Sequence, residues 1–116
     1  MDAEAKQAFI REKARQNERD PEGKKVIWSR HAVTELVADE LTRRQVERAL
    51  QECEPIEDYP VLHRSLPDCL VLGWLTPSEP VHAVVAIDLE RDRIFMVTVY
   101  KPSEEEWGDD WRTRKK

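Results

Sequence analysis

The chain has 116 residues, a formal net charge of -5 and a charged fraction of 37%. This is the length of one typical domain, and it suffices to bury a core without metals or disulfides, which become necessary only below roughly 40 residues. Mean hydropathy is -0.73, but the apolar residues gather in discrete segments after Val26, as in a folded domain. The acidic balance argues against a large duplex-binding surface, because such surfaces need a basic stripe that neutralises phosphates.

The compartment and the cofactors can be predicted from the same composition. No apolar run reaches the roughly 20 residues that span a bilayer, and the polar start of the chain does not resemble a secretory signal. Cys53 and Cys69 lie far apart in apolar segments without CxxC spacing, which predicts buried free thiols in a reducing compartment. We expect a cytoplasmic protein with no membrane partner, no cofactor and no metal.

The first segment, residues 2–20, is rich in helix formers and carries only a short apolar stripe, which predicts a peripheral helix. Pro21 and Gly23 end it through turn chemistry. A solvated helix and an arm that docks a partner both fit this charged segment. We therefore expect three parts: a charged helical extension (1–25), an α+β domain (26–107) and a charged C-terminal tail (108–116).

Two short helices are expected next. Ser29 is positioned to cap the first, in which apolar residues at 32, 33, 36 and 37 follow helical spacing. Thr42 is positioned to cap the second, over 43–52, where apolar residues at 46, 49, 50 and 53 form one stripe. Pro55 ends this helix. The two helices should pack on a sheet as a pair.

After these helices the periodicity becomes that of strands, expected at 56–59, 69–75, 81–89 and 93–100. Short connections join the successive strands, which must then be antiparallel, because a parallel return needs a crossover of about a dozen residues or more. The nearly continuous apolar character of the last two predicts central strands covered on both faces. The expected fold is α+β, with a small antiparallel sheet that closes with the strand 93–100.

Histidine is the side chain best suited to proton transfer near neutral pH, and the chain has three. His31 opens the first core helix, His82 begins the third strand, and His63 lies in an expected loop. A hydrogen-bonded structural role is the alternative for His31 and His82, and simple exposure is the alternative for His63. Their spacing does not match a zinc motif, and no glycine-rich phosphate loop is present.

Two tyrosines lie at strand ends, where a hydroxyl can face a groove while the ring packs beneath. Tyr100 ends the last strand, and simple alternation places it on the face of Thr98, Met96 and Ile94. Tyr59 ends the first of the expected strands. For both tyrosines, an aromatic at the core edge with a solvated hydroxyl is the alternative.

An ordered set of sequence pieces resembles one family. The pieces are Ser29-Arg30-His31-Ala32, Glu57-Asp58-Tyr59-Pro60, Pro67-Asp68-Cys69-Leu70-Val71-Leu72-Gly73, Pro80-Val81-His82-Ala83-Val84-Val85 and Thr98-Val99-Tyr100-Lys101-Pro102, followed by Trp107. The family is a small bacterial domain of unknown function, itself similar to the RelE/ParE superfamily of toxin–antitoxin toxins. The resemblance covers about residues 26–107 and implies a toxin-like domain there, with helices on one side of a curved antiparallel sheet.

The resemblance also implies a function. Better-understood superfamily members cut messenger RNA, which needs a base for the ribose 2′-hydroxyl, an acid for the leaving oxygen and a cation for the phosphate. Carried over by position, the implied catalytic residues are His31, His82 and Tyr100, and Arg64 is the implied phosphate contact. Tyr59 and Thr98, at or near the strand ends, are the further candidate substrate-binding residues. The expectation is an RNA-cleaving toxin of a type II system, a metal-independent endoribonuclease whose partner is a small zinc-finger antitoxin. A non-catalytic protein-binding module is the alternative, and a metal-dependent hydrolase is a third.

Overall fold

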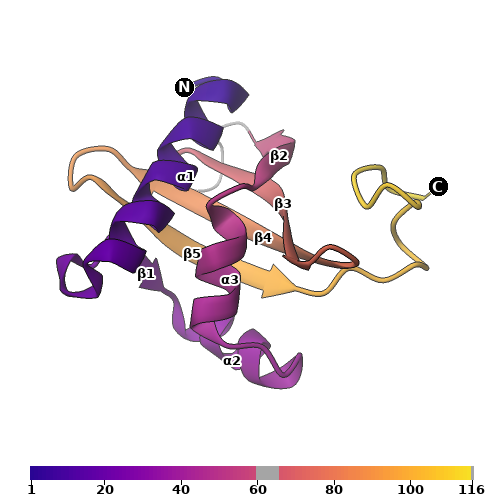
Figure 1. Ribbon diagram of the computed structural model, residues 1–116. Helices are drawn as coiled ribbons and strands as arrows, with labels where there is room; N and C mark the ends of the chain where they lie inside the picture. Colours follow the sequence, from indigo (N-terminus) through magenta and orange to yellow (C-terminus); the bar gives the residue numbers. More distant parts are fainter. Residues whose placement is uncertain (60–65, 116) are drawn as a thin grey trace.

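The computed structural model describes residues 1–59 and 66–115 as three α-helices and a five-stranded sheet (Figure 1). The elements in chain order are α1 (Ala3–Arg19), the 3-10 turn η1 (Pro21–Gly23), β1 (Val26–Trp28), α2 (Arg30–Ala38), α3 (Arg43–Leu50), β2 (Glu54–Tyr59), β3 (Asp68–Thr76), β4 (Glu79–Asp88) and β5 (Arg93–Tyr100). Across the sheet the strand order is β1-β5-β4-β3-β2. No helix of the described ranges is both long and apolar enough to cross a membrane.

Side-chain caps fix where the two core helices begin. The Ser29 side chain accepts a hydrogen bond from the Ala32 N–H at the start of α2. Thr42 and Gln45 form a reciprocal capping box at the start of α3. Each such cap contributes about 1 kcal/mol, because it satisfies backbone donors that the first helical turn leaves unpaired. Both predicted N-caps are confirmed.

The four strands β2 to β5 form an antiparallel meander, as predicted from their short connections. Strand β4 lies at the centre, and all of its residues from Val81 to Asp88 are buried, which confirms that both of its faces are covered. Strand β5 is less covered, since several of its residues are only half-buried. The meander therefore follows the sequence pattern closely.

Strand β1 makes the sheet mixed, which the sequence analysis did not predict. It pairs in parallel with β5, with Val26 opposite Ile94 and Trp28 opposite Met96. Three residues are too few to show a strand period, so the pattern gave no signal. The helices and strands that lie between β1 and β5 in the sequence form the crossover connection that a parallel pair requires. The expected all-antiparallel sheet closing with 93–100 is thus wrong: β1 forms the edge beyond β5.

Helix α1 belongs to the main core and is not peripheral as expected. Ile10 and Ala14 are fully buried in one cluster with α3 and the sheet. The amine of the buried Lys6 pairs with Asp58 and donates to the Asp68 carbonyl at 2.8 Å. Lysine stems can cover apolar surface while the amine finds a polar partner. Because lysines are usually exposed, the charged composition of α1 led to an underestimate of how much of the helix faces the core.

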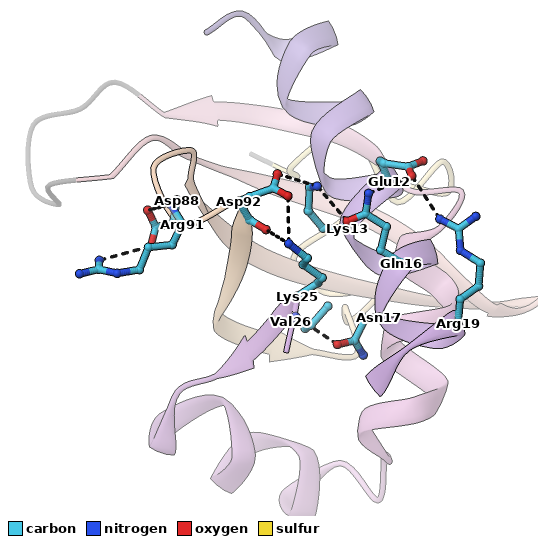
Figure 2. Close-up of polar contacts among 10 residues, drawn as sticks. All are labelled: Glu12, Lys13, Gln16, Asn17, Arg19, Lys25, Val26, Asp88, Arg91 and Asp92. Carbon is cyan, nitrogen blue, oxygen red and sulfur yellow. Dashed lines mark hydrogen bonds and ion pairs between the residues drawn. The ribbon is translucent and has the colours of Figure 1, made fainter. Parts of the chain in front are cut away.

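A second set of contacts fastens the end of α1 to the sheet (Figure 2). The amine of Lys13 lies 2.6 Å from Asp92 in the turn between β4 and β5, and the amine of Lys25 lies 2.9 Å from the same residue. The Asn17 side-chain oxygen accepts the N–H of Val26 at 3.3 Å. Helix α1, strand β1 and the β4–β5 turn are thereby held together.

The C-terminal segment, residues 103–115, covers part of the sheet face opposite α1 and α3. Its Trp107 is 1% exposed and packs with Leu70 and Val84, while Trp111 lies against the same cluster. An antiparallel bridge between Trp107 and Arg114 folds the segment back on itself. The sheet is therefore packed on both faces, by helices on one and by this segment on the other.

Candidate functional site

Five ionisable or polar side chains gather on the sheet face that the C-terminal segment covers. Strand β2 supplies Glu57 and Tyr59, β4 supplies His82, β5 supplies Tyr100, and the C-terminal segment supplies Arg114. We call these five residues the polar cluster. Because they come from four separate parts of the chain, only the folded sheet can assemble them.

The centre of the polar cluster is His82, which is fully buried. Its Nε2 lies 2.7 Å from the carbonyl oxygen of Trp111. A carbonyl only accepts, so Nε2 carries the proton and Nδ1 accepts from the Tyr100 hydroxyl at 3.1 Å. The Trp107 ring meets the imidazole edge-on, with centroids 4.4 Å apart. Burial lowers the pKa of His82, and the imidazole is therefore neutral near pH 7.

The remaining members of the polar cluster surround this pair. The Tyr59 hydroxyl donates to Glu57 at 2.9 Å, and burial followed by this contact raises the pKa of Tyr59 to about 12. Arg114 makes two hydrogen bonds with Glu57, at 2.6 and 3.0 Å, which lower the pKa of that carboxyl. The guanidinium also lies 4.7 Å from the Trp107 ring centroid. Burial raises the pKa of Tyr100, and the Arg114 charge opposes the shift.

A backbone bulge aims Tyr100 at His82. The β4–β5 register shifts so that Val85 lies opposite Met96 while Val84 lies opposite Thr98. Met96 therefore joins the helix-side core, whereas Tyr100 packs on the opposite face. The expectation from simple alternation, which placed Tyr100 with Met96 and Ile94, is wrong because one inserted residue reverses the facing of those beyond it.

His31 and Thr98 contact a different residue, Glu35 of α2. The His31 side chain is 71% exposed, and its Nε2 lies 3.4 Å from a Glu35 carboxylate oxygen. The same oxygen accepts from the Thr98 hydroxyl at 2.5 Å and from the Val99 N–H at 2.9 Å. The recorded contacts of His31 are thus with this carboxylate, and those of His82 are within the polar cluster.

The Glu35 contacts have a structural purpose at the edge of β5. Strand β1 stops at Trp28, so the last part of β5 has no neighbouring strand on that side. Glu35 accepts from the Val99 N–H, and Asp39 accepts from the Lys101 N–H at 2.9 Å. Side chains of α2 and of its C-cap residue therefore satisfy backbone donors that a longer β1 would have paired.

Two residues considered from the sequence, the predicted phosphate contact Arg64 and the loop residue His63, lie outside the described residues. The other five predicted site residues fall into two groups, three in the polar cluster and two beside Glu35. Within 1–59 and 66–115, no group of three His, Cys, Asp or Glu side chains is placed to hold a metal ion.

Sequence reasoning missed Glu57 and Arg114 as members of the site. Arg114 belongs to a stretch that composition marked only as a charged tail. The available signal was Trp111 within that stretch and Trp107 directly before it, because large aromatics in a charged segment indicate packing against the domain. When the tryptophans pack on the sheet, the charged residues next to them in the sequence, Arg114 among them, are brought to the sheet as well.

Fold and cluster together define an α+β domain whose mixed five-stranded sheet carries helices on one face and, on the other, a half-buried tyrosine bonded to a buried histidine. Residues 28–101 match the domain of unknown function DUF4258, and the chain belongs to this family. The matched range contains four members of the polar cluster, with Arg114 beyond its end. Searches of curated proteins and of solved structures gave no match.

Proposed function

We propose that the protein is a toxin-type, metal-independent endoribonuclease with a RelE/ParE-like fold, neutralised by a small zinc-finger antitoxin. The observation that carries the proposal is the hydrogen bond from the Tyr100 hydroxyl to Nδ1 of a neutral, buried His82. Tyr100 is half-buried whereas His82 is fully buried, so we place Tyr100 next to the substrate and His82 behind it. Tyr100 is therefore the proposed catalytic residue and His82 its positioning partner.

The reaction follows from this arrangement. The ribose 2′-hydroxyl gives its proton to the Tyr100 oxygen while Tyr100 passes its own proton to Nδ1 of His82. The 2′-oxygen then attacks phosphorus, the bond to the 5′-oxygen breaks, and a 2′,3′-cyclic phosphate forms. The carbonyl of Trp111, 2.7 Å from Nε2, stabilises the imidazolium, as an orienting acceptor does in other base relays.

Two further roles complete the proposed reaction. The leaving 5′-oxygen needs an acid, for which we propose the exposed His31 on α2. The phosphate needs a cation, and Arg114 is the cluster member whose charge acts on Tyr100. Arg64, Tyr59 and Thr98 complete the proposed substrate contacts.

The test compares wild type with Tyr100→Phe, which keeps the packed ring and removes only the relaying hydroxyl. Purified protein is incubated with fluorophore-labelled single-stranded RNA in excess EDTA, and 2′,3′-cyclic phosphate ends are measured. We expect a rate lower by about 10²- to 10⁴-fold in Tyr100→Phe, and relief of the growth arrest caused by induced wild type. Val37→Ser, at a 74% exposed position of α2, is the matched control. EDTA-resistant cleavage equal in wild type and Tyr100→Phe, or no cleavage by wild type, refutes the proposal.

A non-catalytic protein-binding module is the second candidate, and one observation favours it. Both ring nitrogens of His82 are bonded within the protein, and Glu57 is paired with Arg114. Such a satisfied network stabilises a fold without needing any ligand. Under this alternative, Tyr100→Phe lowers the urea midpoint, wild type leaves RNA intact, and affinity purification yields a stoichiometric partner.

A further inference from the structure

A groove of about 600 Å³ lies on the other side of the molecule from the polar cluster, bordered by the end of α1, strand β1 and helix α3. Figure 1 shows β1 at the edge of the sheet, close to the C-terminal end of α1. Val26, Ile27 and Trp28 supply apolar lining. None of the groove residues belongs to the polar cluster, so this surface is independent of the proposed ribonuclease site.

The groove exposes an unpaired strand edge. β1 is the last strand in the sheet order, and within the described ranges no strand lies beyond it. Lys25 accepts from the Ile94 N–H and Ser29 donates to the Met96 carbonyl, so alternate residues of β1 bond to β5. Val26 and Trp28 therefore direct their backbone groups the other way. Among these outward groups, the Val26 N–H is bonded to Asn17 (Figure 2), and no bond to the others is recorded within residues 1–59 and 66–115.

The charges around this edge are unbalanced. Lys24, Arg43, Arg44 and Arg48 line the groove with only two carboxylates. Glu18 is held by Arg48 at 3.0 Å. The second carboxylate, at position 47, accepts from the Trp28 indole N–H at 2.9 Å. In the described part of the chain, Lys24, Arg43 and Arg44 form no ion pair, so the groove presents positive charge on a protein of net charge -5.

Helix α3 supports the same conclusion. Arg43 and Arg44 occupy its first turn, which contains no acidic residue. Cations at a helix N-terminus oppose the helix dipole, whereas an anion there is stabilised. A negatively charged ligand in the groove would therefore relieve an unfavourable interaction as well as form ion pairs.

We propose that this groove binds an extended acidic segment of a partner protein, which adds as a strand to the free edge of β1. Its backbone pairs with the Val26 carbonyl and the outward backbone groups of Trp28, and its carboxylates reach Lys24, Arg43 and Arg44. Strand addition supplies affinity through main-chain hydrogen bonds and selectivity through the alternating side chains. RNA fits less well, because a nucleic acid would leave the backbone groups of the strand edge unpaired.

The test is a titration of isotope-labelled protein followed by amide chemical shifts. The probe is a capped hexapeptide in which valine alternates with glutamate; the comparison peptides replace glutamate with lysine or place proline at the centre. We expect saturable shifts at 26–28 and 43–48 with the acidic probe alone. Arg43→Glu combined with Arg44→Glu should weaken binding at least about tenfold, and this change suits the helix dipole, so α3 should persist.

Arg91→Glu, a charge reversal at an exposed residue of the β4–β5 turn, is the matched control and should bind as wild type does. An oligouridylate is titrated in parallel. The proposal is overturned if the acidic probe causes no shifts at millimolar concentration, if the lysine or proline peptide binds equally, if the double variant binds normally, or if only the oligouridylate binds at this groove.

Discussion

Replacing Trp107 by alanine should remove much of the stability of the whole domain. The side chain is 1% exposed and meets the His82 ring at 4.4 Å and the Arg114 guanidinium at 4.7 Å. A buried aromatic removes about 200 Å² from water, worth about 5 kcal/mol at ~25 cal/mol per Å². Alanine retains a fraction of this, and the C-terminal segment can partly collapse into the space, so we expect a loss of about 4 kcal/mol.

The assay is urea unfolding followed by circular dichroism. With a typical slope of about 2 kcal/mol per molar urea, the midpoint should fall by about 2 M. Trp74→Ala is the matched control, because Trp74 is 37% exposed and its removal should shift the midpoint far less. A Trp107→Ala midpoint within about 0.5 M of wild type, or equal to that of the control, would show that the C-terminal segment adds little to the fold.

Three further measurements address other features. Burial holds the pKa of His82 below its usual 6.5, so the unfolded chain takes up a proton before the folded protein does as the pH falls. The contribution of neutral His82 to the free energy of unfolding is therefore full above pH 6.5 and is lost as the pH falls towards the pKa of the folded protein. The drop in urea midpoint between about pH 7.5 and 5.5 should consequently be smaller in His82→Gln than in wild type. Burial raises the pKa of both cysteine thiols to about 12, so native protein should resist a thiol reagent at neutral pH and react fully in urea; rapid native labelling would contradict this. Gly73→Ala places a Cβ 3.1 Å from the Cβ and the carbonyl oxygen of Ala49 and should lower the free energy of unfolding by about 1–3 kcal/mol. Gly23→Ala is the control, because its added Cβ meets only a flexible side chain. Equal urea midpoints for the two variants would refute the close packing of α3 on β3.

Sequence patterns that involve neighbouring residues predicted most of the fold. The elements that they did not predict depend on contacts between residues far apart in the sequence. The caps at Ser29 and Thr42 and the meander of β2 to β5 depend on residues close in sequence, and the structure contains them. Strand β1 exists only because β5 lies beside it, and three residues carry no period of their own. Helix α1 was misjudged because Lys6 and Lys13, polar by composition, are buried by tertiary contacts.

The candidate site was predictable to a similar extent. His82 and Tyr100 were identified as polar residues at the ends of apolar strands, and they are directly bonded. The hydrogen bond between them depends on the bulge in β5, which the alternation of apolar and polar residues along the strand does not predict. Arg114 reaches Glu57 only after two tryptophans have docked, so its membership in the polar cluster depends on packing rather than on local sequence.

The parallel pairing of β1 with β5 has a consequence for synthesis on the ribosome. β1 is translated before α2, α3 and the strands β2 to β4, whereas β5, the strand with which it pairs, is translated after all of them. Loop closure over such a separation is slow, and pairing cannot begin until the final strand is available. The nascent chain must therefore carry Val26 to Trp28 unpaired through most of translation. The surface to which we assign an acidic partner can form only after β5 has been synthesised, so strand addition at this edge cannot precede that stage.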